Sequence, residues 1–480
     1  MSTDQYEHHL PEVYNLPKQP FARKVLTIMR YIACELDTPY SGDDLLFSIL
    51  HFDFFNIPAE EIAKVSRRVA ERGYKDKTSL RQYLKEWHNS HGLTMFTPAA
   101  EQAMMEFSPL LESWIRAAQQ VSLQQLFTII INEERISRSL RINEEDSHHL
   151  PEIVLFNAFI AEEVLREPTL TLIGFMNKID EIERVDNVLP SPILSPEIPA
   201  MDPLFINPLL SGFMMNVTAL NNYLDCPLGF FYKSIIRAPY GRSESMEFGS
   251  AVHHAVEKLF QKMQDNDTNT FPSTEEFIED FLQYMTRNPE SFTKEAFERR
   301  LQYGREILTN YYNTYISQWN KVVSVERNIR NVLVSGVPLK GKIDKLEFDG
   351  NKVNLVDYKT GSYEKAAVKL HKFDPPGEYT PNGGDYWRQA VFYKILLDNY
   401  KQKNWQVTST EFDFIEPDTQ NIYRKEKVTI TPADVTTVTQ QIVSTWNKIQ
   451  EKDFYTGCGK ANCRWCNFVK ENNLYITLHQ

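Results

Sequence analysis

The sequence lacks several features that would mark whole classes of protein. No apolar run approaches the roughly 18 residues of a membrane span, so we expect no membrane-spanning helix. The first residues carry neither the basic region nor the apolar stretch of a signal peptide, and we therefore expect a cytoplasmic location. Basic residues are in the minority, with 52 Lys and Arg against 64 Asp and Glu and a net charge of −12. This balance disfavours a protein that coats nucleic acid and permits DNA binding only through a local basic groove or with metal ions offsetting carboxylates in a site.

An ATP-driven motor is also missing. Gly336-x4-Gly341-Lys342 resembles a phosphate-binding loop, but Ile343 follows where such a loop has Ser or Thr. The segment also lies inside a strand pattern, whereas a phosphate-binding loop joins a strand to a helix. The sequence offers no better candidate, so we expect no ATPase motor in this chain.

The composition is otherwise that of a globular protein. The 480 residues, 42% apolar and 24% charged, suffice for two or three domains. Apolar residues at helical spacing predict an all-helical domain over residues 1–189. Six prolines between Pro190 and Pro208 predict a linker or extended strap over residues 190–212. Residues 213–480 mix helix and strand patterns, which predicts an α/β (α+β) domain with a central mixed sheet flanked by helices.

The most informative chemical signal lies between residues 341 and 359. Two short apolar runs around a tight turn predict a β-hairpin. Because side chains alternate along a strand, Asp357 and Lys359 share one face, and Asp344 on the paired strand can converge on the same spot. Two carboxylates and a lysine gathered there could bind a divalent cation and activate a water molecule. These are the groups that hydrolysis of a phosphodiester bond requires. A surface salt bridge is the alternative interpretation.

Two further pairs of side chains are spaced one helical turn apart. His253 and Glu257 would share a helix face, where a neutral imidazole can ligate a divalent metal. Gln389 and Tyr393 have the same spacing; a glutamine can orient a phosphate or a water, and a tyrosine hydroxyl can contact a phosphate. Taken alone, the first pair is more often a surface pair, and the second carries no information.

The five cysteines include a close-set group. Cys458, Cys463 and Cys466 lie in a tail rich in Gly, Lys and Asn that could not form a core of its own. In a cytoplasmic chain, such spacing suggests metal binding in place of disulfides. Cys226 is a candidate fourth ligand, and four thiolates could hold an iron–sulfur cluster or a tetrahedral zinc. Cys34 lies in an apolar helix and is expected in a core.

In chain order, these motifs resemble those of one family. The series Gly-x-x-x-His-x-x-x-Glu, Gly-x-Ile-Asp, Asp-x-Lys and Gln-x-x-x-Tyr is similar to that of RecB-like nuclease domains in the PD-(D/E)xK superfamily, over about residues 213–470. The resemblance implies a site for Mg²⁺ or Mn²⁺ and a lysine, Lys359, that positions or activates the attacking water and stabilises charge. Gln389 and Tyr393 match the motif that follows the catalytic strand. The metal ligands implied by the resemblance are His253, Asp344, Asp357 and the carbonyl of Tyr358.

The cysteines further resemble the iron–sulfur branch of that family, which includes AddB subunits and some CRISPR-associated nucleases. This resemblance implies a [4Fe–4S] cluster at Cys226, Cys458, Cys463 and Cys466. Zinc or an empty site is the alternative, because the tail spacing of Cys-x4-Cys-x2-Cys departs from the usual one. The helical first half resembles the accessory region of superfamily 1 helicases. The resemblance therefore implies a helicase–nuclease partner subunit, or a chain that is a fragment of a longer helicase–nuclease.

Together these observations predict a metal-dependent DNA nuclease. The resemblance implies exonuclease-like processing of DNA ends in recombination and repair, with single-stranded DNA ends threaded past the site. A scaffold that binds DNA or a partner without cleaving is the alternative, favoured by the helical half and the missing motor. A site-specific, restriction-type endonuclease would share the same chemistry.

Overall fold

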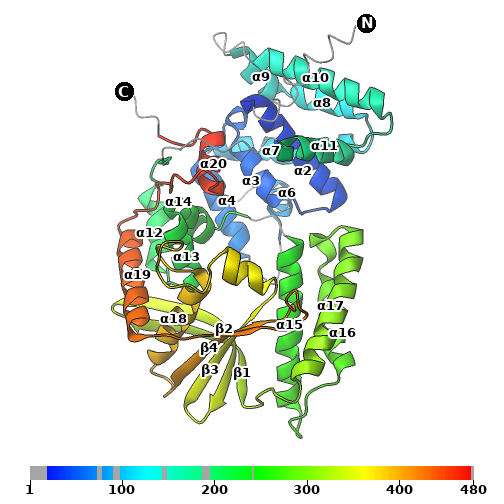
Figure 1. Cartoon of the computed structure of the whole chain (residues 1–480). Coiled ribbons are helices and arrows are strands. Elements are labelled where there is room, and N and C mark those ends of the chain that lie inside the picture. Colours follow the sequence, from blue (N-terminus) through cyan, green and yellow to red (C-terminus); the bar gives the residue numbers. More distant parts are fainter. Residues whose placement is uncertain are drawn as a thin grey trace. The chain divides into compact units, whose positions relative to one another are not determined.

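The computed structural model describes residues 19–72, 78–89, 98–142, 149–185, 195–239 and 243–476 (Figure 1). The chain forms two compact units. Unit 1 comprises Met1–Asp202, Phe231–Gly241 and Thr456–Gln480, and unit 2 comprises Pro203–Phe230 and Arg242–Tyr455. Each unit therefore combines segments that are distant in the sequence. No helix in the described residues combines the length and the hydropathy of a bilayer-spanning segment.

Unit 1 is helical in its described part, as the sequence predicts. Its first segment contains α2 (Pro20–Asp37), α3 (Asp43–Leu50), η2 (Asp53–Phe55), α4 (Ala59–Glu71), α6 (Leu80–Asn89), α7 (Pro98–Ala118), α8 (Leu123–Ile131), α9 (Glu134–Ile142), α10 (His149–Arg166) and α11 (Leu172–Val185). The two later segments add η3 (Phe231–Ile236) and α20 (Arg464–Glu471). Helix α2 shows why this region is helical: Val25, Ile28, Met29 and Ile32 recur on one face, and all four are buried.

The C-terminal tail contributes aromatic rings to the core of unit 1. The ring of Trp465 on α20 stacks on Tyr232 of η3, with centroids 4.5 Å apart and an interplanar angle of 6°. Phe468, one turn further on, stacks on Phe47 of α3 at 5.6 Å. Aromatic pairs of this kind bury large apolar surfaces. The tail is therefore part of the same hydrophobic core as the first helices.

One part of the proline-rich stretch differs from the expectation. Residues 203–211 form helix α12 (Pro203–Ser211), so the extended strap predicted there is wrong for these nine residues. Pro203 occupies the first position, where its missing N–H costs nothing. Pro208 lies inside the helix but only in its second turn, while Ile206 and Leu210 are buried and stabilise it. Residues 186–194, which carry two of the six prolines, lie outside the described residues.

Unit 2 contains a five-stranded mixed sheet flanked by helices, which confirms the predicted fold class. The strands are β1 (Val323–Val334), β2 (Val337–Asp349), β3 (Lys352–Lys359), β4 (Gln406–Phe414) and β5 (Lys425–Val428). They follow one another in sequence order across the sheet, and all neighbours are antiparallel except β3 and β4. The helices are α12, α13 (Val217–Asp225), α14 (Pro227–Phe230), α15 (Glu244–Asp265), α16 (Thr274–Arg287), η4 (Pro289–Ser291), α17 (Lys294–Tyr315), η5 (Lys365–Lys369), α18 (Asp385–Asp398) and α19 (Pro432–Gln450).

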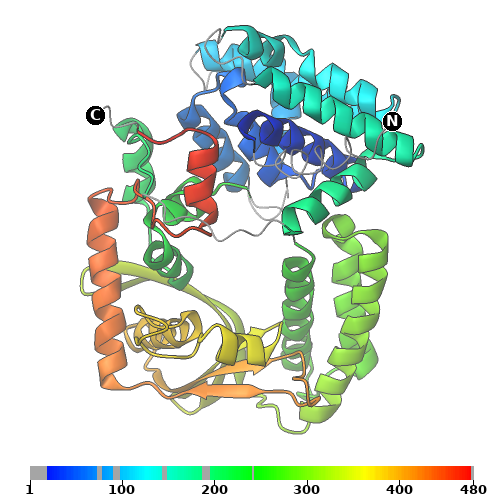
Figure 2. The same ribbon diagram turned by 45° about the horizontal axis from the view of Figure 1, so that its top comes forward.

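The sheet separates two groups of helices, and this arrangement positions the site. Val356 and Tyr358 of β3 pack into the core formed with α15, α16 and α17, while α18 covers the other face (Figure 1, Figure 2). A parallel pair such as β3 and β4 needs a crossover, and α18 provides it. Gly341 in β2 allows α18 to approach, because a Cβ there would lie 2.7 Å from Leu396.

Candidate active site

Two carboxylates lie side by side where the ladder between β2 and β3 ends. The last paired residues are Lys345 and Val356, and Asp344 and Asp357 come next on the two strands. In place of a further backbone pair, the Oδ2 atom of Asp344 accepts a hydrogen bond from the backbone N–H of Tyr358 at 2.9 Å. The side chain of Asp344 thereby closes the end of the hairpin while its carboxylate stays at the site.

Asp357, Lys359, Gln389 and Tyr393 form a chain of polar contacts between β3 and α18. Lys359 Nζ lies 2.7 Å from Asp357 Oδ2 and donates to Gln389 Oε1 at 3.0 Å. The amide nitrogen of Gln389 donates to Asp357 Oδ1 at 2.7 Å and lies 3.3 Å from the hydroxyl of Tyr393. That hydroxyl donates to the carbonyl of Lys342 on β2 at 3.1 Å. The four residues that the sequence pattern singles out are thus joined by one chain of contacts, with Gln389 in contact with each of the other three.

His253 of α15 reaches the same place from the other group of helices. Its Nδ1 lies 3.4 Å from Asp344 Oδ2. The ligand atoms of His253, Asp344 and Glu326 all lie within 4.8 Å of one another. This donor set of one imidazole and two carboxylates could hold a divalent cation. Asp357 stands beside that set, but its two oxygens face Gln389 and Lys359.

Glu326 is a residue that sequence reasoning missed. It lies in β1 with a backbone φ of 51°, in the left-handed region that a non-glycine residue rarely adopts. Its neighbours Val325 and Arg327 pair with Lys345 and Ile343, so Glu326 lies across from Asp344. Its carboxylate forms an ion pair with Lys342. The only signal in the sequence was an isolated acid within a strand pattern, which is too common to single out.

The two aspartates have opposite pKa shifts. Burial raises the pKa of Asp357, and the neighbouring charge of Asp344 adds to this effect, although Lys359 opposes it. Burial also acts on Asp344, but the hydrogen bond and charge of His253 outweigh it and lower the pKa of that carboxyl. The coulombic effect of Asp344 on Asp357 reflects two carboxylates close together in a buried place, an arrangement that a bound cation would stabilise.

The two carboxylates favour the protonated forms of the two basic groups of the site, His253 and Lys359. Burial disfavours the charged imidazole of His253, but the Asp344 carboxylate outweighs burial, so the pKa of His253 is raised. For Lys359 burial likewise opposes the charge, and Asp357 outweighs it, so the pKa of Lys359 is raised. Lys359 is therefore a fixed cation at neutral pH and a poor proton acceptor.

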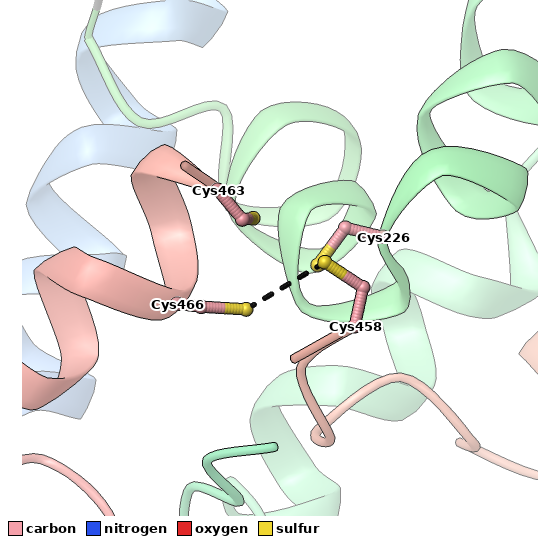
Figure 3. A group of neighbouring side chains, drawn as sticks. All are labelled: Cys226, Cys458, Cys463 and Cys466. Carbon is pink, nitrogen blue, oxygen red and sulfur yellow. Dashed lines mark hydrogen bonds between the residues drawn. The ribbon is translucent and has the colours of Figure 1, made fainter. Parts of the chain in front are cut away.

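The four predicted cysteine ligands are brought together. The sulfur atoms of Cys226, Cys458, Cys463 and Cys466 all lie within 4.8 Å of one another, and the side chains point towards a common centre (Figure 3). Cys226 follows α13 with an extended backbone, and its sulfur accepts the N–H of Gly229 at 3.3 Å. Burial raises the pKa of Cys466 to about 11. Four thiols packed this closely fit an iron–sulfur cluster or a zinc ion, either of which would stabilise the thiolates.

Part of the chain is similar to known proteins. The model of the PD-(D/E)XK nuclease superfamily matches residues 214–470, just over half of the 480 residues. Among solved structures, the crystal structure of a predicted exonuclease from Eubacterium rectale is similar at 14% identity and a TM-score of 0.34, over 53% of this chain and 87% of that chain. No curated protein matches the chain.

Proposed function

Because the chain belongs to the PD-(D/E)XK nuclease superfamily, we propose that it is a deoxyribonuclease dependent on Mg²⁺ or Mn²⁺, with its active site in unit 2. The observation that carries this proposal is the meeting of His253, Asp344, Asp357 and Lys359 at the open end of the β2–β3 ladder. These residues come from positions more than a hundred apart in the sequence. A charged cluster that serves only the fold would not need to combine metal-ligating groups with a lysine in this way.

The proposed ligands are His253, Asp344, Asp357 and the carbonyl of Tyr358, and the position of Glu326 supports adding it to them. Carboxylate and carbonyl oxygens are the donors that Mg²⁺ and Mn²⁺ prefer, and one imidazole is compatible with either ion. When bound, such a cation supplies a Lewis acid for the phosphate and lowers the pKa of a water.

The other residues of the site have roles that follow from their contacts. The ammonium of Lys359 would stand beside the negative charge that develops on the phosphate, and it needs no reorganisation because Asp357 and Gln389 already orient it. Gln389 holds Lys359 and Asp357 at once through the two ends of its amide. Tyr393 would anchor Gln389 and tie α18 to β2.

The test is cleavage of linear DNA in Mn²⁺, with and without chelator, by the wild-type protein and by Asp357→Ala. We expect metal-dependent degradation by the wild type and none detectable by the variant. A matched control is Asp349→Ala at the exposed end of β2, which should cleave as the wild type does. Wild-type cleavage rates in Asp357→Ala, with the fold intact by circular dichroism, would refute the assignment.

We further propose that the enzyme acts at DNA ends in recombination and repair, alongside a helicase–nuclease partner in the cytoplasm. The support is the resemblance to RecB-like domains and the absence of a motor loop in the sequence. The proposal predicts that linear DNA is degraded while a covalently closed circle of the same sequence resists. Cleavage of the circle would favour a restriction-type endonuclease, and binding without any cleavage would favour a scaffold.

We propose a [4Fe–4S] cluster at Cys226, Cys458, Cys463 and Cys466, with zinc as the alternative. The support is the chemistry of four thiols whose sulfur atoms all lie within 4.8 Å of one another. Protein purified anaerobically should be brown and contain iron, and Cys463→Ser should lose the colour. Cys34→Ser is the matched control and should keep it. Colourless protein with stoichiometric zinc would overturn the iron assignment.

A further inference from the structure

The segment that joins β3 to α18, residues 360–384, begins directly after Lys359 and ends five residues before Gln389. We call it the β3–α18 segment. In both views its first part, η5 (Lys365–Lys369, in yellow), lies between α18 and α15, the helices that carry Gln389 and His253 (Figure 1, Figure 2). It also touches α15 closely, because a Cβ on Gly249 would lie 3.0 Å from Thr360 Oγ1. The segment is therefore a neighbour of the proposed active site at both of its ends.

The β3–α18 segment is held in one shape by buried contacts. The guanidinium of Arg388, only 3% exposed, donates to the carbonyls of Asn382 and Gly383 at 2.7 Å. The carbonyl of Lys372 accepts the N–H groups of both Tyr386 and Trp387 at 2.9 Å. Side chains on this segment are thus presented from a fixed backbone, so binding would not first have to order it.

The segment displays a stacked pair of rings to solvent. The imidazole of His371 and the ring of Tyr379 lie parallel, with centroids 4.8 Å apart and an interplanar angle of 6°. His371 is fixed by a 2.8 Å contact between its Nδ1 and Asp374. Tyr379 is nevertheless 74% exposed, so one face of its ring rests on the imidazole and the other is open. A flat, supported, uncovered ring is suited to stacking with another planar group.

The stacked pair is connected to the site through one tyrosine. The ammonium of Lys359 lies 4.5 Å from the ring centroid of Tyr386, and the ammonium of Lys372 lies 4.6 Å from the same centroid. Lys372 is the residue next to His371. A DNA strand with one phosphate at Lys359 would therefore have a second ammonium group, that of Lys372, on the same ring. The stacked pair of His371 and Tyr379 follows directly, because His371 precedes Lys372 in the sequence.

We propose that the β3–α18 segment binds single-stranded DNA, with a base stacked on the open face of Tyr379. This inference rests on the proposed nuclease function and assigns the substrate form to it. A paired base in a duplex has no free face, whereas every unpaired base has one, so stacking selects single strands without regard to sequence.

Stacking, and not charge, should dominate this contact. The segment carries three lysines but also Glu364, Asp374 and Glu378. Lys365 and Lys369 are exposed and could each meet a phosphate, while Glu364 is engaged by Ser362 and Thr419. Removing one phosphate contact should lower the salt dependence of binding by only about 0.7 in the log–log slope.

The test measures binding of a fluorescent oligothymidylate by fluorescence anisotropy. EDTA is present, so that the proposed metal-dependent cleavage does not take place during the measurement. Tyr379→Ala should weaken binding on the order of tenfold, and Tyr379→Phe, which keeps the ring, should bind as the wild type does. Lys369→Ala should lower the salt slope. Lys403→Ala is its matched control, because Lys403 is exposed near the other end of the parallel β3–β4 pair and should change neither value.

Three outcomes would reject the inference: equal affinity of Tyr379→Ala and wild type, an equal loss of affinity for a duplex of the same length, or no binding by the wild type. Metal-dependent cleavage by the wild type is measured in parallel on the same oligomer. Cleavage together with unchanged binding by Tyr379→Ala would reject the stacking surface and leave the nuclease standing. Tyr379-dependent binding without cleavage in Mg²⁺ or Mn²⁺ would instead reject the nuclease and with it the role of the surface in catalysis.

Discussion

Gln389 and Asp357 are joined by a 2.7 Å hydrogen bond between the side-chain amide of α18 and the carboxylate of β3. The other end of the same amide accepts from Lys359 at 3.0 Å. Because an amide has one donor end and one acceptor end, this geometry fixes which end faces the anion and which faces the cation. Gln389 thus bridges the ion pair of Asp357 and Lys359. A carboxylate at this position would lack the donor to Asp357, and an alanine would lack both contacts.

Replacing Gln389 by Glu should therefore impair catalysis without unfolding the protein. The variant places a carboxylate against Asp357, where like charges repel, and removes the donor. We expect a loss of about 10- to 100-fold in metal affinity or cleavage rate, measured by titrating Mn²⁺. Gln283→Glu on the exposed surface of α16 is the matched control and should behave as wild type. Undiminished cleavage by Gln389→Glu would show that the contact has no catalytic role.

Glu326→Gln tests the ligand that the sequence did not reveal. It keeps the shape of the side chain but removes one negative charge from the group formed with His253 and Asp344. We expect a higher Mn²⁺ concentration for half-maximal cleavage, by about tenfold, with thermal stability close to that of the wild type. A metal dependence identical to that of the wild type would exclude Glu326 from the metal site.

Gly304→Ala should destabilise unit 2. Gly304 lies in α17 against the buried ring of Phe281 on α16, and an added Cβ would come within 2.2 Å of that ring. Overpacking of this kind costs about 1–3 kcal/mol, because a buried ring cannot move aside freely. Thermal denaturation should show a lower Tm. Gly212→Ala, whose added Cβ would meet nothing closer than 3.9 Å, is the control and should leave the Tm nearly unchanged.

Unit 1 should lose stability in mild acid because of His51. Burial lowers the pKa of His51 to about 4 from its ordinary 6.5, although its hydrogen bond to the Phe47 carbonyl opposes the shift. The unfolded chain therefore binds a proton at a pH where the folded unit does not. Stability from this group is complete above pH 6.5 and falls as the pH decreases towards 4, by about 3 kcal/mol at most.

His51→Phe removes the titrating group while keeping a ring beside Phe47 and Phe468. The variant should show a flatter dependence of unfolding free energy on pH between about 6.5 and 4 than the wild type. Urea denaturation at several pH values measures that slope. An unchanged slope would mean that other groups cause any acid sensitivity.

The sequence was sufficient for the parts of the site that depend on local periodicity. Alternation along a strand places Asp357 and Lys359 on one face, and helical spacing brings Gln389 and Tyr393 together, as the structure has them. The fold class followed from the order of strand and helix patterns. The contact between His253 and Asp344 joins residues far apart in the sequence, so local periodicity does not predict it. Only the order of the motifs along the chain made it predictable.

What could not be predicted depends on tertiary context. Glu326 reaches the site because its backbone adopts a left-handed conformation, for which an acidic residue gives no local signal. Helix α12 forms despite two prolines, because buried Ile206 and Leu210 stabilise it. Sequence periodicity likewise gives no sign that Trp465 packs on Tyr232 and Phe468 on Phe47, because these pairs are far apart in the sequence.

The discontinuity of unit 1 has a practical consequence for dissecting the protein. A recombinant fragment of residues 213–480, cut where motif similarity begins, would retain Trp465 and Phe468 but lose Phe47, against which Phe468 stacks. Both rings would keep Tyr232 as a partner but lose their contacts with Phe47, which leaves part of their apolar surface uncovered. The full-length chain, which keeps the terminal 25 residues together with both the first helices and Cys226, is therefore the better starting point for the experiments above.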